Sequence, residues 1–288
     1  MSLTVRDHAT VDEFLASAGN FLVAREAENN LLLGISSAIR ATPEIFADDP
    51  PRFATVTDAA GKIIAATMRT PPHNQVLSSI DDLAAADRLV DALRDEPLPG
   101  VLGPTEAAAR FAAAWTDATG QSARLEVAER IFRLERVIPP HRPASGAWRM
   151  AEPRDRDVIA RWIVEFVADA TRDTPPPDPE AAADRWIARL GRAPYLWEDG
   201  DAVVSWVGAS GETPHGIRIG PVYTPPSKRN RGYASSLTAA ASADQLAAGR
   251  RFCFLFTDLA NPTSNKIYQA IGYQPVCDVD QYRFATDA

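Results

Sequence analysis

Three cations gather in the stretch "TPPSKRNRGYASSL", residues 224–237. Lys228, Arg229 and Arg231 precede Gly232, and the small residues that follow are typical of a helix packed closely on a sheet. The first amides of a helix lack partners within the helix and carry partial positive charge. A glycine there lets the backbone approach a ligand closely. Together these features predict a cradle for a diphosphate group.

A solvated basic loop is the ordinary explanation of such a charge cluster, and the charges by themselves do not decide between the two. The sequence motifs around the cluster are more informative about whether it binds a diphosphate. The nucleotide-binding patterns GxxxxGK[ST] and GxGxxG are both absent from the chain. The residues that follow the cradle therefore bear on what it binds.

Two motifs, separated by one helix and one strand, carry a family resemblance. Residues 229–234, "RNRGYA", resemble the acyl-CoA signature Arg/Gln-x-x-Gly-x-Gly/Ala of the GNAT N-acetyltransferase superfamily. Asn230 and Ala234 stand where many members have glycine. The stretch "TDLANPTSNKIYQAIGY" resembles the second family motif, Asn-x-x-Ala-x-x-Leu-Tyr-x-x-x-Gly-Phe. Its matching residues are Asn261, Ser264, Ile267, Tyr268, Gly272 and Tyr273.

The resemblance implies acetyl-CoA as co-substrate, with no metal. It also implies that a bulge splays the strand before the cradle from its neighbour, and Gly220–Pro221 suits such a bulge. The alternative is an ordinary irregularity of an edge strand. The expected contacts with the pantetheine arm and the diphosphate are Val222, Tyr223, Thr224, Lys228, Arg229, Asn230, Arg231, Gly232, Tyr233, Ala234, Asn261 and Ser264.

The implied chemistry is attack of a neutral amine on a thioester. Tyr268 matches the family tyrosine and is the candidate acid for the leaving thiolate; the alternative is a tyrosine packed in the core. Asn261 is also a natural turn residue before Pro262.

The sequence does not identify the general base that would take the proton of the amine, because the strand "GIRIGPVY" has no carboxylate. His215, Glu165 and Asp169 are candidates, but we favour solvated roles for all three, with Arg161 pairing Glu165. The amine then loses its proton to water.

The acceptor is expected to be a primary amine of a small molecule or peptide, bound between the loop at residues 170–180, the two helices beside it and the final strands. Helical and strand tryptophans are more often core residues than ligand cages, so at most one or two are expected to line this pocket. The tryptophans concerned are Trp162, Trp186, Trp197 and Trp206.

The proline-rich stretch at residues 136–148 suits a linker and divides the chain into two patterned halves. We expect an α/β fold of two GNAT-like domains, 1–138 and 147–288, joined by residues 139–146. Each domain is a mixed, mostly antiparallel sheet flanked by helices, with the splayed strand pair in the second. The expected first-half elements are helices at 11–18, 28–39, 81–94 and 106–119, a hairpin at 53–69, and one or two strands at 123–137. The expected second-half elements are strands at 147–151, 217–224 and 251–257, a hairpin at 193–210, helices at 154–170, 181–190, 231–248 and 263–271, and a strand at 273–284 that closes its sheet.

The first half lacks the acyl-CoA motif. Its corresponding helix start carries Asp81 and Asp82, which would repel a diphosphate, and no glycine. We therefore expect a degenerate domain that supports the second half or shapes its acceptor site.

The formal net charge of −8 argues against a nucleic-acid partner. No apolar run is long enough to cross a membrane, and the first residues lack the order of a secretory signal.

Cys253 and Cys277 suit buried thiols in a reducing cytoplasm, and no Cys/His cluster has zinc-ligand spacing. The sequence does not decide the oligomeric state, and a homodimer is possible. An alternative function is that of a non-catalytic acyl-CoA sensor.

Overall fold

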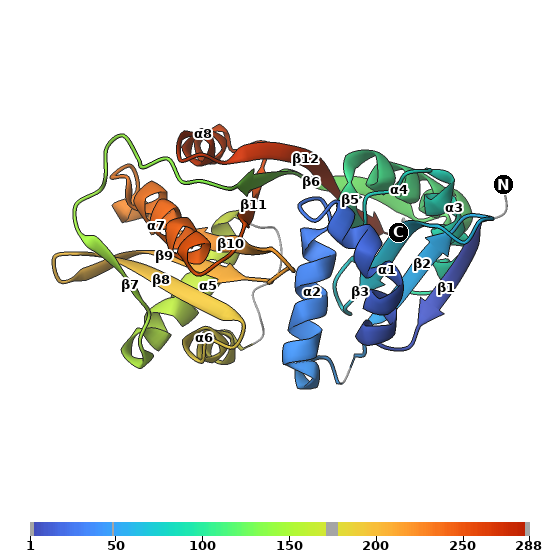
Figure 1. The fold of residues 1–288 in the computed structure, drawn as a ribbon, viewed down its shortest axis with the longest axis horizontal. Helices are drawn as coiled ribbons and strands as arrows, with labels where there is room; N and C mark the ends of the chain where they lie inside the picture. The colour runs from blue at the N-terminus through green and yellow to red at the C-terminus, as the bar shows by residue number, and fades with distance from the viewer. Residues whose placement is uncertain (1–2, 48, 171–177, 286–288) are drawn as a thin grey trace. The chain divides into compact units, whose positions relative to one another are not determined.

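The computed structural model describes residues 3–47, 49–170 and 178–285 (Figure 1). The chain forms two compact units. The first consists of residues 1–132, 256–262 and 275–288, and the second of residues 133–255 and 263–274.

Unit 1 contains a sheet in the order β1-β2-β3-β4-β5-β12-β6. Its strands are β1 Thr4–His8, β2 Arg52–Thr57, β3 Ile63–Arg69, β4 Gln75–Leu77, β5 Gly100–Pro104, β6 Ser122–Leu134 and β12 Gln274–Ala285. Its helices are α1 Val11–Ala24, α2 Asn30–Ala41, the 3₁₀ turn η1 Pro43–Phe46, α3 Ala84–Leu93 and α4 Thr105–Thr119.

Two separate apolar cores cover the two faces of this sheet. Because successive side chains of a strand point to opposite faces, Phe53 packs with α1 and α2 whereas Val56 packs with α3 and α4. The α4 helix ends at Gly120, whose φ of 72° is the left-handed conformation predicted for a C-terminal cap.

Strand β12 lies between β5 and β6, although it follows the whole of unit 2 in sequence. It pairs with β5 in antiparallel register, from Val279 opposite Pro104 to Arg283 opposite Gly100. The expectation that this strand closes the sheet of the second half is therefore wrong. Local periodicity predicts a strand, but the partner depends on contacts between residues far apart in the sequence.

Unit 2 contains the strand order β11-β10-β9-β8-β7. Its strands are β7 Ala147–Met150, β8 Arg192–Asp199, β9 Ala202–Ser210, β10 Gly216–Tyr223 and β11 Phe252–Asp258. Its helices are η2 Pro153–Asp155, α5 Arg156–Ala170, α6 Pro179–Ile187, η3 Pro226–Lys228, α7 Tyr233–Ala247 and α8 Pro262–Ala270.

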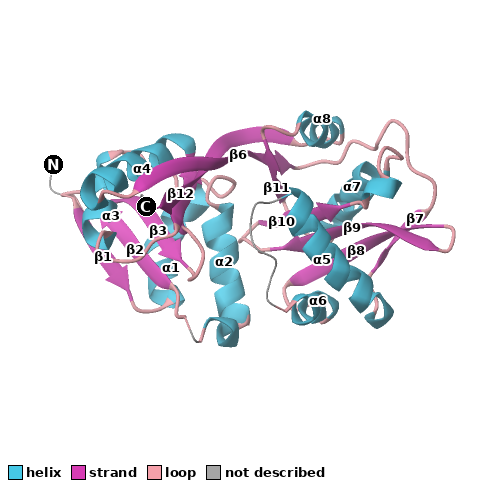
Figure 2. Cartoon of the chain, turned by 180° about the vertical axis from the view of Figure 1, so that it is seen from behind, coloured by secondary structure: helices cyan, strands magenta, loops and turns pink. Residues whose placement is uncertain are grey.

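Helices cover both faces of these strands. Figures 1 and 2 show α7 on one face of β8–β10 and α5 with α6 on the other. Neighbouring residues of β8 illustrate the division: the Tyr195 hydroxyl donates to Asp244 of α7 at 2.6 Å, while Leu196 packs in the cluster of α5 and α6. Trp162, Trp186, Trp197 and Trp206 are all buried, as expected for core residues.

The two units repeat one order of elements. In each, three antiparallel pairings are followed by a parallel pair, β4 with β5 and β10 with β11. Two helices follow the first strand, one helix joins the parallel pair, and one follows it. The predicted mixed, mostly antiparallel α/β fold in two copies is confirmed. Strands β1, β4 and β5 are absent from the sequence prediction.

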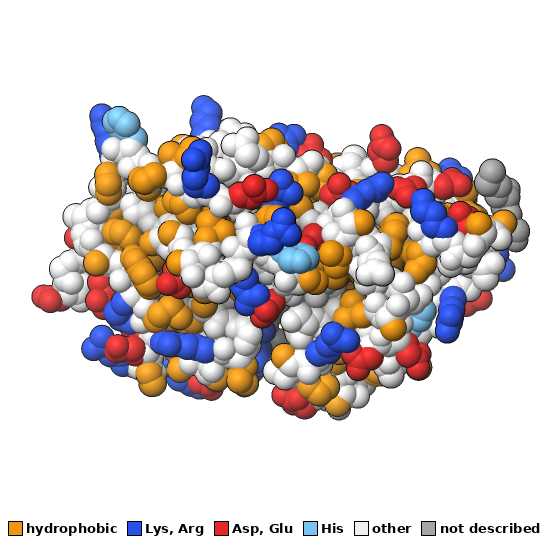
Figure 3. Space-filling view, in the orientation of Figure 1, with side chains coloured by type: hydrophobic (Ala, Val, Ile, Leu, Met, Phe, Trp, Pro, Cys, Tyr) orange, Lys and Arg blue, Asp and Glu red, His pale blue; other side chains and the backbone are white. Residues whose placement is uncertain are grey.

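No helix in the described ranges is long and apolar enough to span a bilayer. On the face shown in Figure 3, basic and acidic side chains are interspersed rather than gathered by sign.

Candidate active site

The parallel pair of unit 2 separates before its strands end. Pairing of β10 with β11 covers only Gly216–Arg218 opposite Phe252–Phe254, although β10 continues to Tyr223. On its other side, the register of β10 with β9 shifts between Ile219 and Val222. This shift is the bulge expected at Gly220–Pro221, and it leaves the last part of β10 unpaired with β11.

The cradle follows directly after β10. Gly232 is the N-cap residue directly before α7 and has a φ of 83°, and no side chain caps this helix. Ser236 N donates to Gly232 O at 2.9 Å, but the amides of residues 230–235 donate to no acceptor in the described part of the chain. A helix N-terminus with so many uncompensated amides suits an anion with several oxygens.

Asn230 explains how the motif works without one of its usual glycines. Its φ of 63° lies in the left-handed region, which asparagine tolerates better than other non-glycine residues. Asn230 and Gly232 thus bend the same short loop. The resulting backbone aims successive amides in one direction.

The three cations of the cradle differ in their surroundings. Lys228 and Arg231 form no ion pair with the described residues. Arg229 donates through Nε to Thr224 O at 2.9 Å and through Nη2 to Asp169 Oδ2 of α5 at 2.5 Å. The Arg229 side chain is nevertheless 45% exposed, so it can contact an anion while Asp169 holds it in place.

The segment expected to be a linker packs against the cradle. Ala144 N donates to Ser236 Oγ of α7 at 3.0 Å, and Trp197 Nε1 donates to Ser145 O at 2.7 Å. The Tyr233 hydroxyl donates to Asp199, whose pKa is lowered by this bond first and by the Ser145 hydroxyl second. Residues 142–145 are therefore neighbours of the site that sequence reasoning missed.

Tyr223 contacts the helical side of the site. Its hydroxyl donates to Glu165 Oε2 at 2.9 Å, and its ring lies 6.0 Å from that of Trp162. Burial and the Glu165 carboxylate raise the pKa of Tyr223 to about 12. Arg161 also lies 3.9 Å from Glu165, as the sequence predicted. The hydrogen bonds of Glu165 and Asp169 to residues after the bulge were not predicted.

Some of the backbone groups predicted to contact the pantetheine arm already have hydrogen-bond partners within the protein. Ser205 Oγ donates to Tyr223 O at 3.0 Å and lies 2.8 Å from the Thr224 hydroxyl. Thr224 O accepts from Arg229. The structure thus ties this strand end to β9, and Val222 pairs with Val207 of β9 beside the bulge.

Tyr268 lies on α8 and is buried, with its ring 6.1 Å from that of Tyr273. Its hydroxyl has no hydrogen-bond partner within the ranges that the structure describes, whereas the Tyr273 hydroxyl pairs with Ser242 Oγ at 2.8 Å. Burial raises the pKa of Tyr268 to about 12, so the phenol keeps its proton at neutral pH. A protonated phenol without a partner can serve as an acid.

The remaining predicted residues lie elsewhere. Asn261 N donates to Asp258 O in the turn after β11, in a segment that belongs to unit 1, and Ser264 is in the first turn of α8. His215 precedes β10, and its ring contacts Phe252 where the parallel strands are still paired. The cradle and α8 follow the opposite ends of these strands, so His215 is not brought to them. Residues 171–177 of the expected acceptor loop lie outside the described residues.

Where the structure describes side chains, no three His, Cys, Asp or Glu residues are arranged to hold a metal ion. The donors present are backbone amides, cations and one phenol. This set can bind a diphosphate and supply one proton.

Residues 163–273 match the acetyltransferase (GNAT) family. The match covers α5 from Ile163 onward, α6, the separated strand pair, the cradle and Tyr268. No curated protein matches the sequence of the chain.

Several solved structures share the fold over nearly the whole chain. A Drosophila protein of a structural genomics programme has a TM-score of 0.69 at 14% identity, covering 99% of each chain. A tandem GNAT protein from the clavulanic acid biosynthesis pathway has a TM-score of 0.59 at 13% identity, covering 99% of this chain and 98% of its own. A GCN5-related N-acetyltransferase from Sphaerobacter thermophilus has a TM-score of 0.59 at 16% identity, covering 98% and 95%. At these identities the likeness establishes the fold.

Proposed function

Residues 163–273 form a domain of the acetyltransferase (GNAT) family, and on that premise we propose that unit 2 transfers an acyl group from acyl-CoA to an amine. Acetyl-CoA is the proposed donor, and a primary amine of a small molecule or peptide in the cytoplasm is the proposed acceptor. Residues 147–288 carry the catalysis in this proposal, residues 1–138 are a degenerate copy, and residues 139–146 join them.

The observation that carries the proposal is the run of amides at residues 230–235 without acceptors, next to Lys228 and Arg231. A solvated basic loop would need no left-handed Asn230 and Gly232. The diphosphate of CoA would accept hydrogen bonds from these amides, with the arginine held by Asp169 beside it. The pantetheine arm would then extend along β10 toward the bulge, where β11 no longer occupies its edge.

The reaction proposed is direct attack in a ternary complex. The amine nitrogen forms a bond to the thioester carbonyl carbon, and the carbon–sulfur bond then breaks. Tyr268 donates its phenolic proton to the departing thiolate, which needs a group that is still protonated at neutral pH. The phenol regains a proton from solvent after the free thiol leaves.

Water receives the proton of the amine in this scheme. No carboxylate lies on β10, and Glu165 already accepts a hydrogen bond from Tyr223. We assign Glu165 and Tyr223 to positioning: the pair fixes the end of β10 against α5. Asp169 has the same role toward Arg229.

A thiol-release assay with acetyl-CoA and a panel of primary amines tests the proposal, together with calorimetric titration of CoA. We expect CoA to bind and at least one amine class to stimulate thiol release. If CoA binds but no amine stimulates thiol release, the result favours the second candidate function, a non-catalytic acyl-CoA sensor. The absence of a carboxylate on β10 is the reason to keep this candidate. No binding of CoA would reject both functions.

A further inference from the structure

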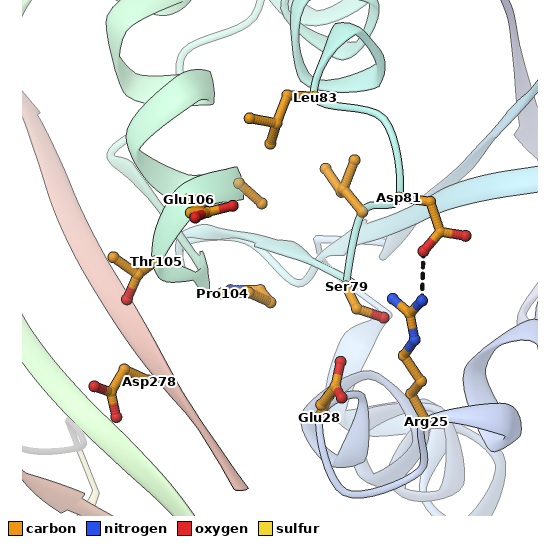
Figure 4. Close-up of a pocket in the computed structure, with 11 residues that line it drawn as sticks. Arg25, Glu28, Ser79, Asp81, Leu83, Pro104, Thr105, Glu106 and Asp278 are labelled. Atoms are coloured by element: carbon orange, nitrogen blue, oxygen red, sulfur yellow. Dashed lines mark hydrogen bonds and ion pairs between the residues drawn. The ribbon is translucent and has the colours of Figure 1, made fainter.

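Unit 1 contains a cavity of about 510 Å³ that the proposed function does not use (Figure 4). This volume is in the range of small-molecule sites. All of its lining residues belong to unit 1. They are Arg25, Glu28, Ser79, Ile80, Asp81, Leu83, Pro104, Thr105, Glu106, Ala107 and Asp278.

The cavity opens where the parallel pair of unit 1 ends. Strands β4 and β5 pair only at Gln75–Val76 opposite Val101–Leu102. The lining residues at 79–83 follow β4, and those at 104–107 follow β5. In the repeated order of elements, this position corresponds to the separation of β10 and β11 in unit 2.

The chemistry of this position differs from that of the cradle. The amide of Ala84, at the start of α3, already donates to Asp82 Oδ1 at 3.0 Å. The residue before α3 is Leu83 in a right-handed conformation, where α7 has a left-handed glycine. A diphosphate would meet a carboxylate here instead of free amides, so acyl-CoA does not fit.

Four of the residues that line the cavity are acidic: Glu28, Asp81, Glu106 and Asp278. Two of them are already compensated: Asp81 pairs with Arg25 at 2.5 Å, and Asp278 of β12 accepts two hydrogen bonds from Arg130 at 2.6 and 2.9 Å. These pairs leave Glu28 and Glu106 as the uncompensated acidic groups of the cavity.

Glu28 and Glu106 come from different elements. Glu28 is half-buried in the segment between α1 and α2, and Glu106 is in the first turn of α4. Neither makes a hydrogen bond or an ion pair with any described residue. Figure 4 shows both carboxylates at the cavity, on opposite sides of Pro104 and Ser79. Ile80 and Leu83 add apolar surface to the lining of the cavity.

We propose that this cavity binds an organic dication such as an α,ω-diamine, with one ammonium group at Glu28 and the other at Glu106. Pro104, which Figure 4 draws between the two carboxylates, would contact the methylene groups between the charges. No three acidic, histidine or cysteine side chains converge on one point in the ranges that the structure covers, which favours an extended cation over a single metal ion. This inference does not depend on the activity of unit 2.

Calorimetric titration of the full chain with 1,4-diaminobutane at low salt tests the inference, with 1,4-butanediol as the uncharged analogue. We expect saturable binding of the diamine and none of the diol. Glu28→Gln should weaken binding about tenfold, because the carboxylate is half-buried, and Glu106→Gln about threefold, because it is exposed. Raising the salt concentration should weaken binding further.

Glu44→Gln is the matched control. It removes the same charge from an exposed residue of unit 1 outside the cavity and should leave the affinity within twofold. Glu165→Gln removes a carboxylate of unit 2 and should also leave the affinity unchanged. Circular dichroism and the unfolding midpoint of each variant show whether it is folded.

The inference is overturned if the wild type does not bind the diamine, or if the two cavity variants bind it as Glu44→Gln does. Loss of binding in Glu165→Gln would move the diamine to unit 2 and also overturn it. Equal binding of Mg²⁺ with the same loss in both cavity variants would exclude an organic cation. None of these results bears on CoA binding, which the cradle variants test separately.

Discussion

Replacing Gly232 by alanine tests the cradle most directly. A Cβ atom at this position would have Arg142 O as its nearest neighbour, at 3.6 Å, and Ala144 Cβ at 3.8 Å, so space is not limiting. The cost comes from φ, which is 83°. Holding alanine in the left-handed region costs about 1–2 kcal/mol. The chain can avoid this cost only by rotating the backbone, which would turn the amides of residues 230–235 away from their common direction.

Gly249 provides the control at the other end of α7. It has a φ of 99°, and a Cβ there would meet nothing within 4 Å. Gly249→Ala should therefore lose about as much stability as Gly232→Ala while leaving the cradle unchanged. One lost hydrogen bond to a charged phosphate costs about 1.5–3 kcal/mol. We thus expect the CoA dissociation constant of Gly232→Ala to rise at least about tenfold, and that of Gly249→Ala to stay within twofold.

Urea unfolding measures the stability of both variants, and calorimetric titration with CoA measures the affinity. The contrary outcome is that Gly232→Ala binds CoA as tightly as Gly249→Ala at equal stability. That result would mean that the amides at the start of α7 do not hold the diphosphate.

Tyr268→Phe should lower kcat about a hundredfold while the CoA dissociation constant stays within twofold, because only the transferable proton is removed; an unchanged kcat in the thiol-release assay would contradict its role as acid. Arg229→Ala should weaken CoA binding about tenfold at low salt and less at high salt, as titrations at two salt concentrations can show, and an equal loss at both would argue against a charge contact. Arginine hydrogen bonds lower the pKa of Glu126 and Asp278, so the stability they give is complete at neutral pH and is lost as the pH falls below the ordinary carboxyl range. Arg130→Ala should therefore reduce the stability difference between about pH 7 and about pH 3 in urea unfolding, and an unchanged difference would exclude the contribution of Asp278.

The sequence allowed the site-bearing elements of unit 2 to be predicted because their signals are local. The family resemblance implied the bulge, which a glycine followed by proline inside a strand pattern suits. Three cations before a glycine suggested the cradle, and the two motifs around them favoured it over a solvated basic loop. The buried tryptophans follow from the same kind of pattern, since large apolar side chains recur at helical and strand spacing. These features need no information about distant residues.

What could not be predicted depends on short strands or on distant partners. Strand β4 has three residues and β5 contains two glycines and a proline, so neither shows the alternation that marks a strand. Asp169 and Glu165 gain their roles from residues 60 and 58 positions away. On the sequence alone both are ordinary acidic residues of a helix surface, and a solvated role was the reasonable interpretation.

The place of β12 has a consequence for how the molecule is made. A nascent chain cannot complete the sheet of unit 1 until residues 274–285 have left the ribosome, by which time all of unit 2 has been synthesised. The earlier part of the chain must wait with an open strand edge beside β5. Contacts that join such distant segments slow folding, so we expect unit 1 to reach its native state late.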